Sequence, residues 1–364
     1  MNKPIRVLHV CQRMEAAGVQ SFIMNMYRNI DRENVQFDFL VHYKEKQFYE
    51  DEIAMLGGKI YKLSVREDYN IIKYFKELNC FFKTHKYDIV HGHMDSLGAI
   101  YLGAAKWNGV PVRIAHAHTD FVQDGIKKIP RHIMISLYKM NANQLFACSH
   151  HSGKFMFKNQ KFEIYRNAID VKMFAYDEKK RKVIREKLSL CDELVIGNVG
   201  RFHVVKNQEF ILDIVGEIKK RINKVMLLLI GSGELEEQLV AKIKSLDLEG
   251  NVMLLKERKD INEIYQAMDI FVLPSLFEGI PLVGIEAQAS GLPCLFSDRI
   301  NREVAITSNN YFLSIDNGVN LWVEKIIEVE KNIRRRDETD SICISGYYSK
   351  DVAKRLENYY LSIN

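Results

Sequence analysis

The chain has 364 residues, of which 47% are apolar and 27% charged, and its formal net charge is +5. This length fits two globular domains better than a single core, and the absence of any run of eighteen apolar residues argues against a membrane-spanning segment. No signal-peptide pattern precedes the first apolar run, so we expect a cytoplasmic protein.

The net positive charge is concentrated in the first half of the chain. A basic half indicates an anionic partner such as a phosphate, an acidic lipid surface or a nucleic acid, but it suits a solvated basic face equally well. No nucleic-acid-binding motif or basic helix is visible, so we expect no nucleic-acid partner.

Short apolar runs alternate with helical stretches along the whole chain. In the first half, strands are predicted at residues 5–10, 37–42, 59–63, 88–91, 112–116 and 145–148. After a charged stretch the pattern restarts, with strands predicted at residues 194–199, 225–230, 252–255, 270–273, 293–296 and 311–315. Such alternation predicts two parallel sheets covered by helices.

The fold class predicted is therefore α/β, with two Rossmann-like domains facing one another across a cleft. We expect an N-terminal domain at residues 1–166 and a C-terminal domain at residues 167–346. Residues 347–364 have apolar side chains at helical spacing and predict a helix that docks back on the N-terminal domain. Because ligands of open α/β sheets bind beyond the carboxyl ends of the strands, we expect the site there.

Histidines gather at two of these strand ends. His91 and His93 lie at the end of one predicted strand, and His116 and His118 at the end of another. A lone histidine is more often structural than catalytic, but strand-end pairs point into the expected cleft. Half of a zinc site is an alternative interpretation; no carboxylate or cysteine has matching ligand spacing, so we expect no metal.

Two cations follow a strand of the second half. Arg201 and Lys206 lie in the loop after residues 194–199, where they could clamp a diphosphate, arginine through its planar fork and lysine as a point charge. The alternative is a pair of solvent-facing basic residues. The next strand ends at Gly231-Ser232-Gly233, a turn that lets backbone amides approach a ligand closely.

Two glutamates separated by seven residues form the most informative feature. Glu278 precedes a predicted helix start and Glu286 lies one turn inside it, so the two carboxylates could hold hydroxyls on two parts of one ligand. A helix-dipole partner is the simpler alternative for each. The residues that begin the helix, where amides could face an anion, are Ile280 to Gly284, and Pro281 suits its first turn.

The glutamate segment, residues 267–281 and 286–293, resembles the signature of the family 4 retaining glycosyltransferases, which have the GT-B fold. The Gly200-Arg201 pair with Lys206, and the glycine turn at 231–233, match that family's other donor-domain motifs in order and spacing. The chain is similar to bacterial enzymes that assemble capsular polysaccharide or exopolysaccharide.

The resemblance implies a role for each matching residue. Arg201 and Lys206 would bind the donor diphosphate, Glu286 the ribose hydroxyls and Glu278 the transferred sugar. A histidine near the reacting carbon would be His118, with His116 in reserve. The glycine loop of the family matches residues 16–21, where one glycine remains. The donor-binding set is thus Gly18, Arg201, Lys206, Gly231, Gly233, Glu278, Gly279, Ile280, Pro281, Leu282 and Glu286, with His118 and Glu278 catalytic and His93 and His116 as acceptor-side candidates.

The function expected is transfer of a hexose or N-acetylhexosamine, with retention of configuration, from a UDP-sugar to a hydroxyl of a growing, lipid-linked surface polysaccharide repeat unit. No cofactor or metal is expected. A sugar-nucleotide epimerase of the same fold and a non-catalytic sugar-nucleotide-binding subunit are the alternatives. Residues 125–134 mix cations with apolar side chains and predict peripheral contact with an anionic membrane.

Overall fold

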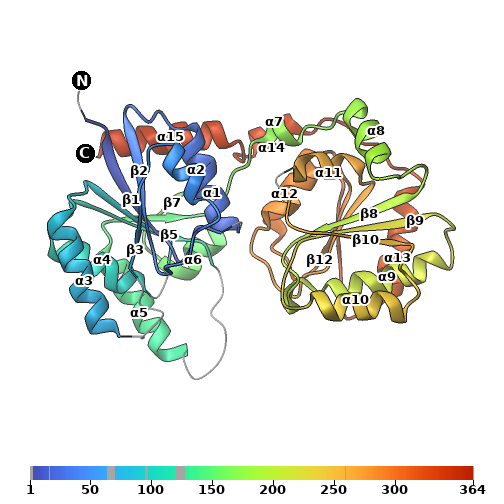
Figure 1. The fold of residues 1–364 in the computed structure, drawn as a ribbon, viewed down its shortest axis with the longest axis horizontal. Coiled ribbons are helices and arrows are strands. Elements are labelled where there is room, and N and C mark those ends of the chain that lie inside the picture. Colours follow the sequence, from blue (N-terminus) through green and yellow to red (C-terminus); the bar gives the residue numbers. More distant parts are fainter. Residues whose placement is uncertain are drawn as a thin grey trace. The chain divides into compact units, whose positions relative to one another are not determined.

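The computed structural model describes residues 3–15, 17–63, 70–94, 97–119, 128–258 and 260–363, without the side chains of residues 128–131. It forms two compact units. The first comprises Met1–Ala168 and Tyr348–Asn364, and the second comprises Ile169–Tyr347. Each unit is built on an open parallel sheet with helices on both faces (Figure 1).

In the described residues of the first unit, seven strands follow the order β3-β2-β1-β4-β5-β6-β7. Their bounds are β1 (Ile5–Val10), β2 (Val35–Val41), β3 (Ile60–Lys62), β4 (Ile89–Gly92), β5 (Val112–Ala117), β6 (Gln144–Ala147) and β7 (Glu163–Ile164). The sheet grows outward in one direction from β1 and in the other from β4. The carboxyl ends of β1 and β4 therefore mark its switch point, where ligands of such sheets bind.

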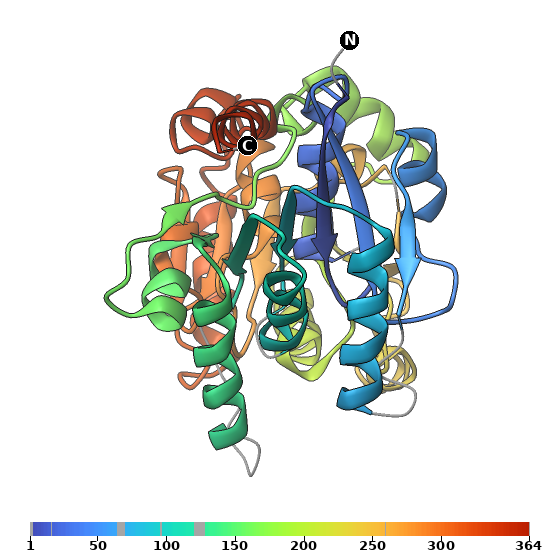
Figure 2. The same cartoon turned by 90° about the vertical axis from the view of Figure 1, so that its left-hand side faces the viewer.

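Helices cover both faces of this sheet because successive strand residues point to opposite sides. Val7 and Ile89 pack on the side of α1, α2 and α15, whereas Leu8 and Val90 pack on the side of α3, α4 and α5. Figure 2 shows α3, α4 and α5 as neighbours, in blue, teal and green. The helices before the C-terminus are α1 (Gly18–Asn29), α2 (Glu50–Met55), α3 (Ile71–Thr84), α4 (Gly98–Trp107), α5 (Lys128–Asn141) and α6 (His150–Phe157).

The C-terminal helix α15 (Ser349–Ser362) returns to the first unit and packs beside α1 (Figure 1). Its Val352, Leu356 and Tyr360 are buried in the core that α1 shares with the sheet. The helical spacing of the apolar side chains produces this buried face. The docking predicted from the sequence is confirmed.

In the described residues of the second unit, six parallel strands follow the order β10-β9-β8-β11-β12-β13. Their bounds are β8 (Leu194–Val199), β9 (Val225–Ile230), β10 (Val252–Leu255), β11 (Ile270–Leu273), β12 (Cys294–Ser297) and β13 (Asn310–Leu313). The switch point here lies between β8 and β11. Both glutamates and both donor-side cations follow these two strands in the sequence.

The helices of the second unit also form two layers. Those that pack into one core with the sheet are α9 (Gln208–Lys219), α10 (Glu236–Ser245) and α13 (Val319–Glu330). The others are α7 (Val171–Phe174), α8 (Glu178–Lys187), α11 (Ile261–Ala267), α12 (Leu282–Ala289) and α14 (Thr339–Ile344), with 3-10 turns η1 (Val204–Lys206) and η2 (Arg302–Val304). Nowhere in the described ranges is a helix both long enough and apolar enough to span a bilayer.

Candidate active site

The carboxyl ends of β8 and β11 bring the donor-side residues of the second unit together. The loop after β8 and the segment after β11 are joined by a hydrogen bond from the Leu276 amide to the Val205 carbonyl, at 2.8 Å. The Asn207 side chain also donates to the Pro274 carbonyl at 3.2 Å. Residues about 70 positions apart in the chain therefore lie side by side because their strands are neighbours in the sheet.

Glu278 and Lys206 form an ion pair at this junction, from Nζ to Oε1. The Ser275 hydroxyl donates to the same carboxylate oxygen at 3.1 Å. Both charged side chains are mostly buried, with 16% of the glutamate and 23% of the lysine side chain exposed. An arriving anion would compete with Glu278 for Lys206.

Glu286 lies one turn inside α12 and is half-buried. Burial raises the pKa of Glu286 to about 7, although a hydrogen bond from the Tyr265 hydroxyl lowers it. That hydroxyl donates to Oε2 at 3.0 Å. No side chain caps the start of α12, where Pro281 occupies the N-cap position, so the helix begins with the uncapped amides that suit an anion.

The glycine turn packs directly on the loop that carries Arg201. Gly231 and Gly233 have φ values of +151° and +157°. A Cβ at Gly231 would lie 2.1 Å from the Gly200 carbonyl oxygen, and one at Gly233 would lie 2.3 Å from that of Phe202. Glycine is therefore required at both positions by backbone packing.

Arg201 is the most exposed cation of the candidate site, with 69% of its side chain in solvent. Its Nη2 donates to Glu234 Oε2 at 3.1 Å, and Glu234 Oε1 lies 3.3 Å from His203 Nε2. Glu234 thus tethers the guanidinium to the end of β9. A screened, exposed pair of this kind is weak, so a phosphate could displace the glutamate.

In the first unit, the histidines form a stripe on one face of the sheet. His9 of β1 stands opposite His91 of β4, and Gly92 stands opposite Ala115 of β5. Continuing this register puts His93 beside His116. Because residues two apart share a face, all these rings lie on the side of α1 and α15. Sequence spacing showed the His91/His93 and His116/His118 pairs but not His9.

The imidazoles of this stripe are hydrogen-bonded in two chains. His9 Nδ1 lies 2.9 Å from His93 Nε2, and His93 Nδ1 lies 2.9 Å from His118 Nε2. In the second chain, His91 Nε2 lies 3.0 Å from His116 Nδ1. Burial lowers the pKa of all five rings, and that of His9 and of His118 to about 3. The rings are therefore neutral.

His116 and His118 differ in their exposure and in their hydrogen bonds. His116 is 2% exposed, and its Nδ1 bonds to His91. His118 is half-buried, and in the described residues no hydrogen bond within 3.5 Å reaches its Nδ1. Phe22 of α1 contacts both rings. His118 is thus the ring that a ligand of this unit could reach.

Gly18 begins α1, and a Cβ there would meet no atom within 4 Å. Ala17, which replaces a glycine of the family's loop, has φ −134° and is unstrained. Ala16 of the same loop lies outside the described residues. No steric requirement for glycine at position 18 follows from these contacts.

Two groups of three imidazoles could in principle hold a metal ion, namely His9, His91 and His93, and His93, His116 and His118. Within each group the nitrogens lie within 4.8 Å of one another. Both nitrogens of His93, which belongs to both groups, are already bonded to other imidazoles. A metal would have to replace those bonds.

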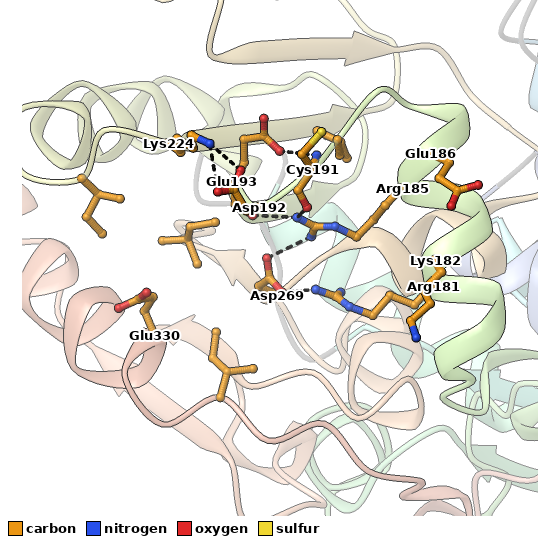
Figure 3. A pocket seen from close by; sticks show the side chains of 14 residues that line it. Arg181, Lys182, Arg185, Glu186, Cys191, Asp192, Glu193, Lys224, Asp269 and Glu330 are labelled. Atoms are coloured by element: carbon orange, nitrogen blue, oxygen red, sulfur yellow. Dashed lines mark hydrogen bonds and ion pairs between the residues drawn. The ribbon is translucent and has the colours of Figure 1, made fainter.

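A cavity of about 610 Å³ lies at the amino-terminal end of the second sheet, away from these strand ends (Figure 3). Asp269 accepts hydrogen bonds there from Arg181 at 2.5 Å and from Arg185 at 3.2 Å. Lys224 is similarly paired with Asp192 at 2.7 Å. The two arginine pairs tie α8 to the residue before β11, which gives Arg181, Arg185 and Asp269 a structural role.

Comparisons with known proteins agree with this arrangement. Residues 16–172 match the model of "Glycosyltransferase Family 4", and residues 180–341 match that of "Glycosyl transferases group 1". The chain is 32% identical to EpsF of Bacillus subtilis (strain 168), a protein assigned as a glycosyltransferase, over 98% of this chain and 96% of that one. The chain belongs to the family 4 glycosyltransferases.

Two further proteins that match are less similar in sequence to this chain. An Escherichia coli UDP-Gal:α-D-GlcNAc-diphosphoundecaprenol α-1,3-galactosyltransferase is 27% identical over 89% of this chain and 88% of its own length. The crystal structure of Anabaena HepE in complex with UDP and glucose covers 98% of both chains with a TM-score of 0.76 and 14% identity. This likeness shows that the family 4 chain has the GT-B fold.

Several contacts of this glycosyltransferase were not found by sequence reasoning. They involve Tyr265, which bonds Glu286, Ser275, which bonds Glu278, and Glu234, which bonds Arg201. Ser275 stands in the strand-end segment that the sequence singled out, so its position was a usable signal. Tyr265 lies 21 residues before Glu286, and no local sequence pattern predicts the contact between them.

Proposed function

We propose that this chain is a retaining hexosyltransferase that moves a hexose or N-acetylhexosamine from a UDP-sugar to a hydroxyl of a growing, lipid-linked surface polysaccharide repeat unit. The observation that carries the proposal is the meeting of Lys206, Glu278 and Ser275 at one switch point, on the helix start that leads to Glu286. The choice of UDP and of a lipid-linked acceptor is supported by the Escherichia coli galactosyltransferase, which uses UDP-Gal and a diphosphoundecaprenol acceptor, and by HepE, whose crystal structure contains UDP.

In this proposal the donor diphosphate draws Lys206 away from Glu278. Arg201, Lys206 and the first amides of α12 then meet the charge that develops on the leaving diphosphate, a preorganised electrostatic role that needs no metal. Glu278, freed from the lysine, accepts hydrogen bonds from the transferred sugar, and Glu286 accepts from the ribose hydroxyls. Gly18, Gly231 and Gly233 allow backbone to approach the donor.

The proposed chemistry takes place on one face of the sugar. The bond from the anomeric carbon to the phosphate oxygen breaks, the acceptor oxygen bonds to the same face, and the acceptor proton passes to the leaving phosphate. In this scheme the family resemblance puts His118 near the reacting carbon, and its Nδ1, unlike its Nε2, is not bonded to another imidazole. His93 and His116 are the further acceptor-side candidates.

We also propose a cytoplasmic protein that touches an anionic membrane at the first unit. Of the segment predicted for this contact, residues 125–127 lie outside the described part, but Ile133 is 56% exposed on α5. Exposed apolar side chains also occur on α3, at Ile71, Ile72 and Phe75. Failure to bind anionic vesicles at low salt would remove this part of the proposal.

The direct test is incubation with a panel of UDP- and GDP-sugars, with and without a lipid-diphosphate glycan extract. Release of UDP that depends on the extract supports transfer. Isomerised donor without acceptor would instead identify an epimerase, and binding without either product would identify a non-catalytic subunit. Retention is read from the anomeric configuration of the isolated product by NMR.

A further inference from the structure

Three imidazoles of the first unit are bonded end to end, and the last of them is His118. His9 comes from β1, His93 follows β4 and His118 follows β5. The bonds run from His9 Nδ1 to His93 Nε2 and from His93 Nδ1 to His118 Nε2, each 2.9 Å long. The chain ends at His9 Nε2 on one side and at His118 Nδ1 on the other, and in the described residues no hydrogen bond within 3.5 Å reaches either nitrogen. The Asn167 side chain nevertheless interacts with the His118 ring and favours its protonated form.

Such a chain couples the tautomers of its members. A neutral imidazole has one N–H group and one lone pair, so His93 must donate through one nitrogen and accept through the other. If His9 donates from Nδ1, then His93 and His118 also carry their protons on Nδ1. If the direction is reversed, all three rings carry the proton on Nε2.

The buried end of the chain selects between these two states. His9 is 1% exposed, and its ring lies 4.1 Å from that of Phe37 and 5.8 Å from that of Phe39, measured between centroids. In the Nε2–H state this apolar pocket would enclose an N–H group without an acceptor. In the Nδ1–H state it encloses only a lone pair, and unpaired acceptors are better tolerated in proteins than unpaired N–H groups.

We infer that His9 and His93 are positioning residues that hold His118 in the Nδ1–H tautomer, so that its free nitrogen donates a hydrogen bond to a substrate oxygen instead of accepting a proton. This inference deepens the proposed function and depends on it for the nature of that oxygen. The tautomer itself is a property of the free protein. It agrees with a reaction in which the leaving phosphate, and not a histidine, takes the acceptor proton.

The second chain provides an internal reference. The Tyr360 hydroxyl of α15 lies 2.6 Å from His91 Nδ1, a length typical of an O–H donor. If the phenol donates, His91 must carry its proton on Nε2 and donate to His116 Nδ1, which leaves His116 protonated on Nε2. Unlike His9, His116 has an acceptor for this proton, because the Tyr165 backbone interacts with its ring and favours protonation. The two chains thus predict opposite tautomers for the neighbouring rings of His116 and His118, whose centroids are 4.1 Å apart.

The test is a long-range proton–nitrogen correlation spectrum of the full chain labelled with 15N-histidine. Ring nitrogens with and without a proton are separated in such a spectrum, and the variants His118→Asn and His116→Asn assign the two signals by their loss. We expect the Nδ1–H form for His118 and the Nε2–H form for His116. An Nε2–H form or an imidazolium at His118, or a stoichiometric bound metal that shifts these signals, would overturn the inference.

Two variants separate positioning from general packing. His9→Leu removes the end of the first chain, so we expect a mixture of tautomers at His118 and a kcat about tenfold lower with an unchanged donor KM. Tyr360→Phe breaks only the second chain and should leave the His118 signal unchanged. If His9→Leu does not fold, the spectrum of the unchanged protein still shows which tautomer His118 adopts.

The two proposals fail in different ways. An Nδ1–H His118 in a protein without transferase activity would refute the proposed function alone. An Nε2–H His118 in an active transferase would refute the positioning role alone.

Discussion

Glu278 and Glu286 are held in contrasting surroundings, although eight positions separate them. Glu278 contacts the Lys206 ammonium and the Ser275 hydroxyl. Glu286 receives a hydrogen bond from Tyr265, but burial raises its pKa to about 7. In the ligand-free protein the Glu286 carboxylate therefore has spare hydrogen-bonding capacity, which the hydroxyl groups of a ligand could fill.

This burial predicts a pH-dependent cost in stability. Below a pH of about 4.5 Glu286 is protonated in both the folded and the unfolded chain; as the pH rises to about 7 the unfolded chain ionises first and the folded state loses stability. Relative to Glu286→Gln, we expect the ligand-free protein to lose up to about 2–3 kcal/mol between pH 5 and pH 8. Urea unfolding at both pH values measures this difference.

The matched control is Glu330→Gln, which changes an exposed glutamate of the same unit. It should follow the unchanged protein at both pH values. If the free energy of unfolding changed with pH equally in Glu286→Gln and in the unchanged protein, Glu286 would ionise in the folded state as easily as in the unfolded one, which would contradict this prediction.

At the residue scale, the sequence was informative where a side chain belongs to a local pattern. Arg201, Lys206, Glu278 and Glu286 all follow strand ends that apolar runs marked clearly. His9 was not found as a member of the histidine stripe, because a buried position inside a strand has no local sign of a polar role. Only the order of the strands places it beside the other histidines.

Among the elements, the turn at residues 231–233 contains two glycines whose added Cβ atoms would each clash with backbone. We predict that Gly233→Ala destabilises the second unit by about 1–3 kcal/mol, because its Cβ would lie 2.3 Å from the Phe202 carbonyl oxygen at a φ of +157°. Thermal unfolding measures the loss. The loop of Arg201 should move as well, so donor affinity should fall.

Gly216→Ala is the matched control for this substitution. Gly216 lies inside α9, and a Cβ there would meet no atom within 4 Å. Alanine in a helix interior is favoured over glycine by about 0.5–1 kcal/mol, so this variant should be slightly more stable. Equal effects of the two substitutions would contradict the packing described for the turn.

The sequence predicted the positions of the strands better than the contacts between residues of different elements. The strands at residues 5–10, 194–199, 225–230, 252–255 and 270–273 have the predicted bounds. β7 was missed because its two residues are too few to show a periodic pattern. The charged stretch at residues 177–182 begins α8, where the Asp177 side chain accepts from the amides of Lys179 and Lys180.

At the scale of the whole molecule, α15 joins the end of the chain to the first unit. We predict that Leu356→Ala, which empties a buried position of this helix, destabilises the first unit by about 2–5 kcal/mol. Amide hydrogen exchange should become faster in α1 and α15, while exchange in the second unit should change less. Leu361→Ala, at a position of the same helix that is 42% exposed, is the control and should cost little. Unaltered exchange in α1 would contradict the packing described.

The repeated strand–helix pattern was sufficient to predict a parallel sheet in each half, because the connections leave few topologies open. Strand order, and with it the neighbours of each site residue, could not be predicted from the residues, since it depends on packing between distant segments. The donor-side residues could be named as candidates because their motifs resemble the family's. The hydrogen bonds of the two histidine chains match no family motif, so they could not be predicted in this way.

The central claim, that the strand ends of the second unit bind a nucleoside diphosphate sugar, is tested most directly by calorimetric titration of UDP into Glu286→Ala and Glu278→Ala, with turnover measured in parallel. We predict that Glu286→Ala weakens UDP binding by about 10- to 100-fold, as expected for lost hydrogen bonds to a charged group. We expect Glu278→Ala to retain UDP binding but to lose turnover, and Glu330→Ala to change neither. Unchanged UDP affinity and unchanged turnover in both site variants would contradict the account.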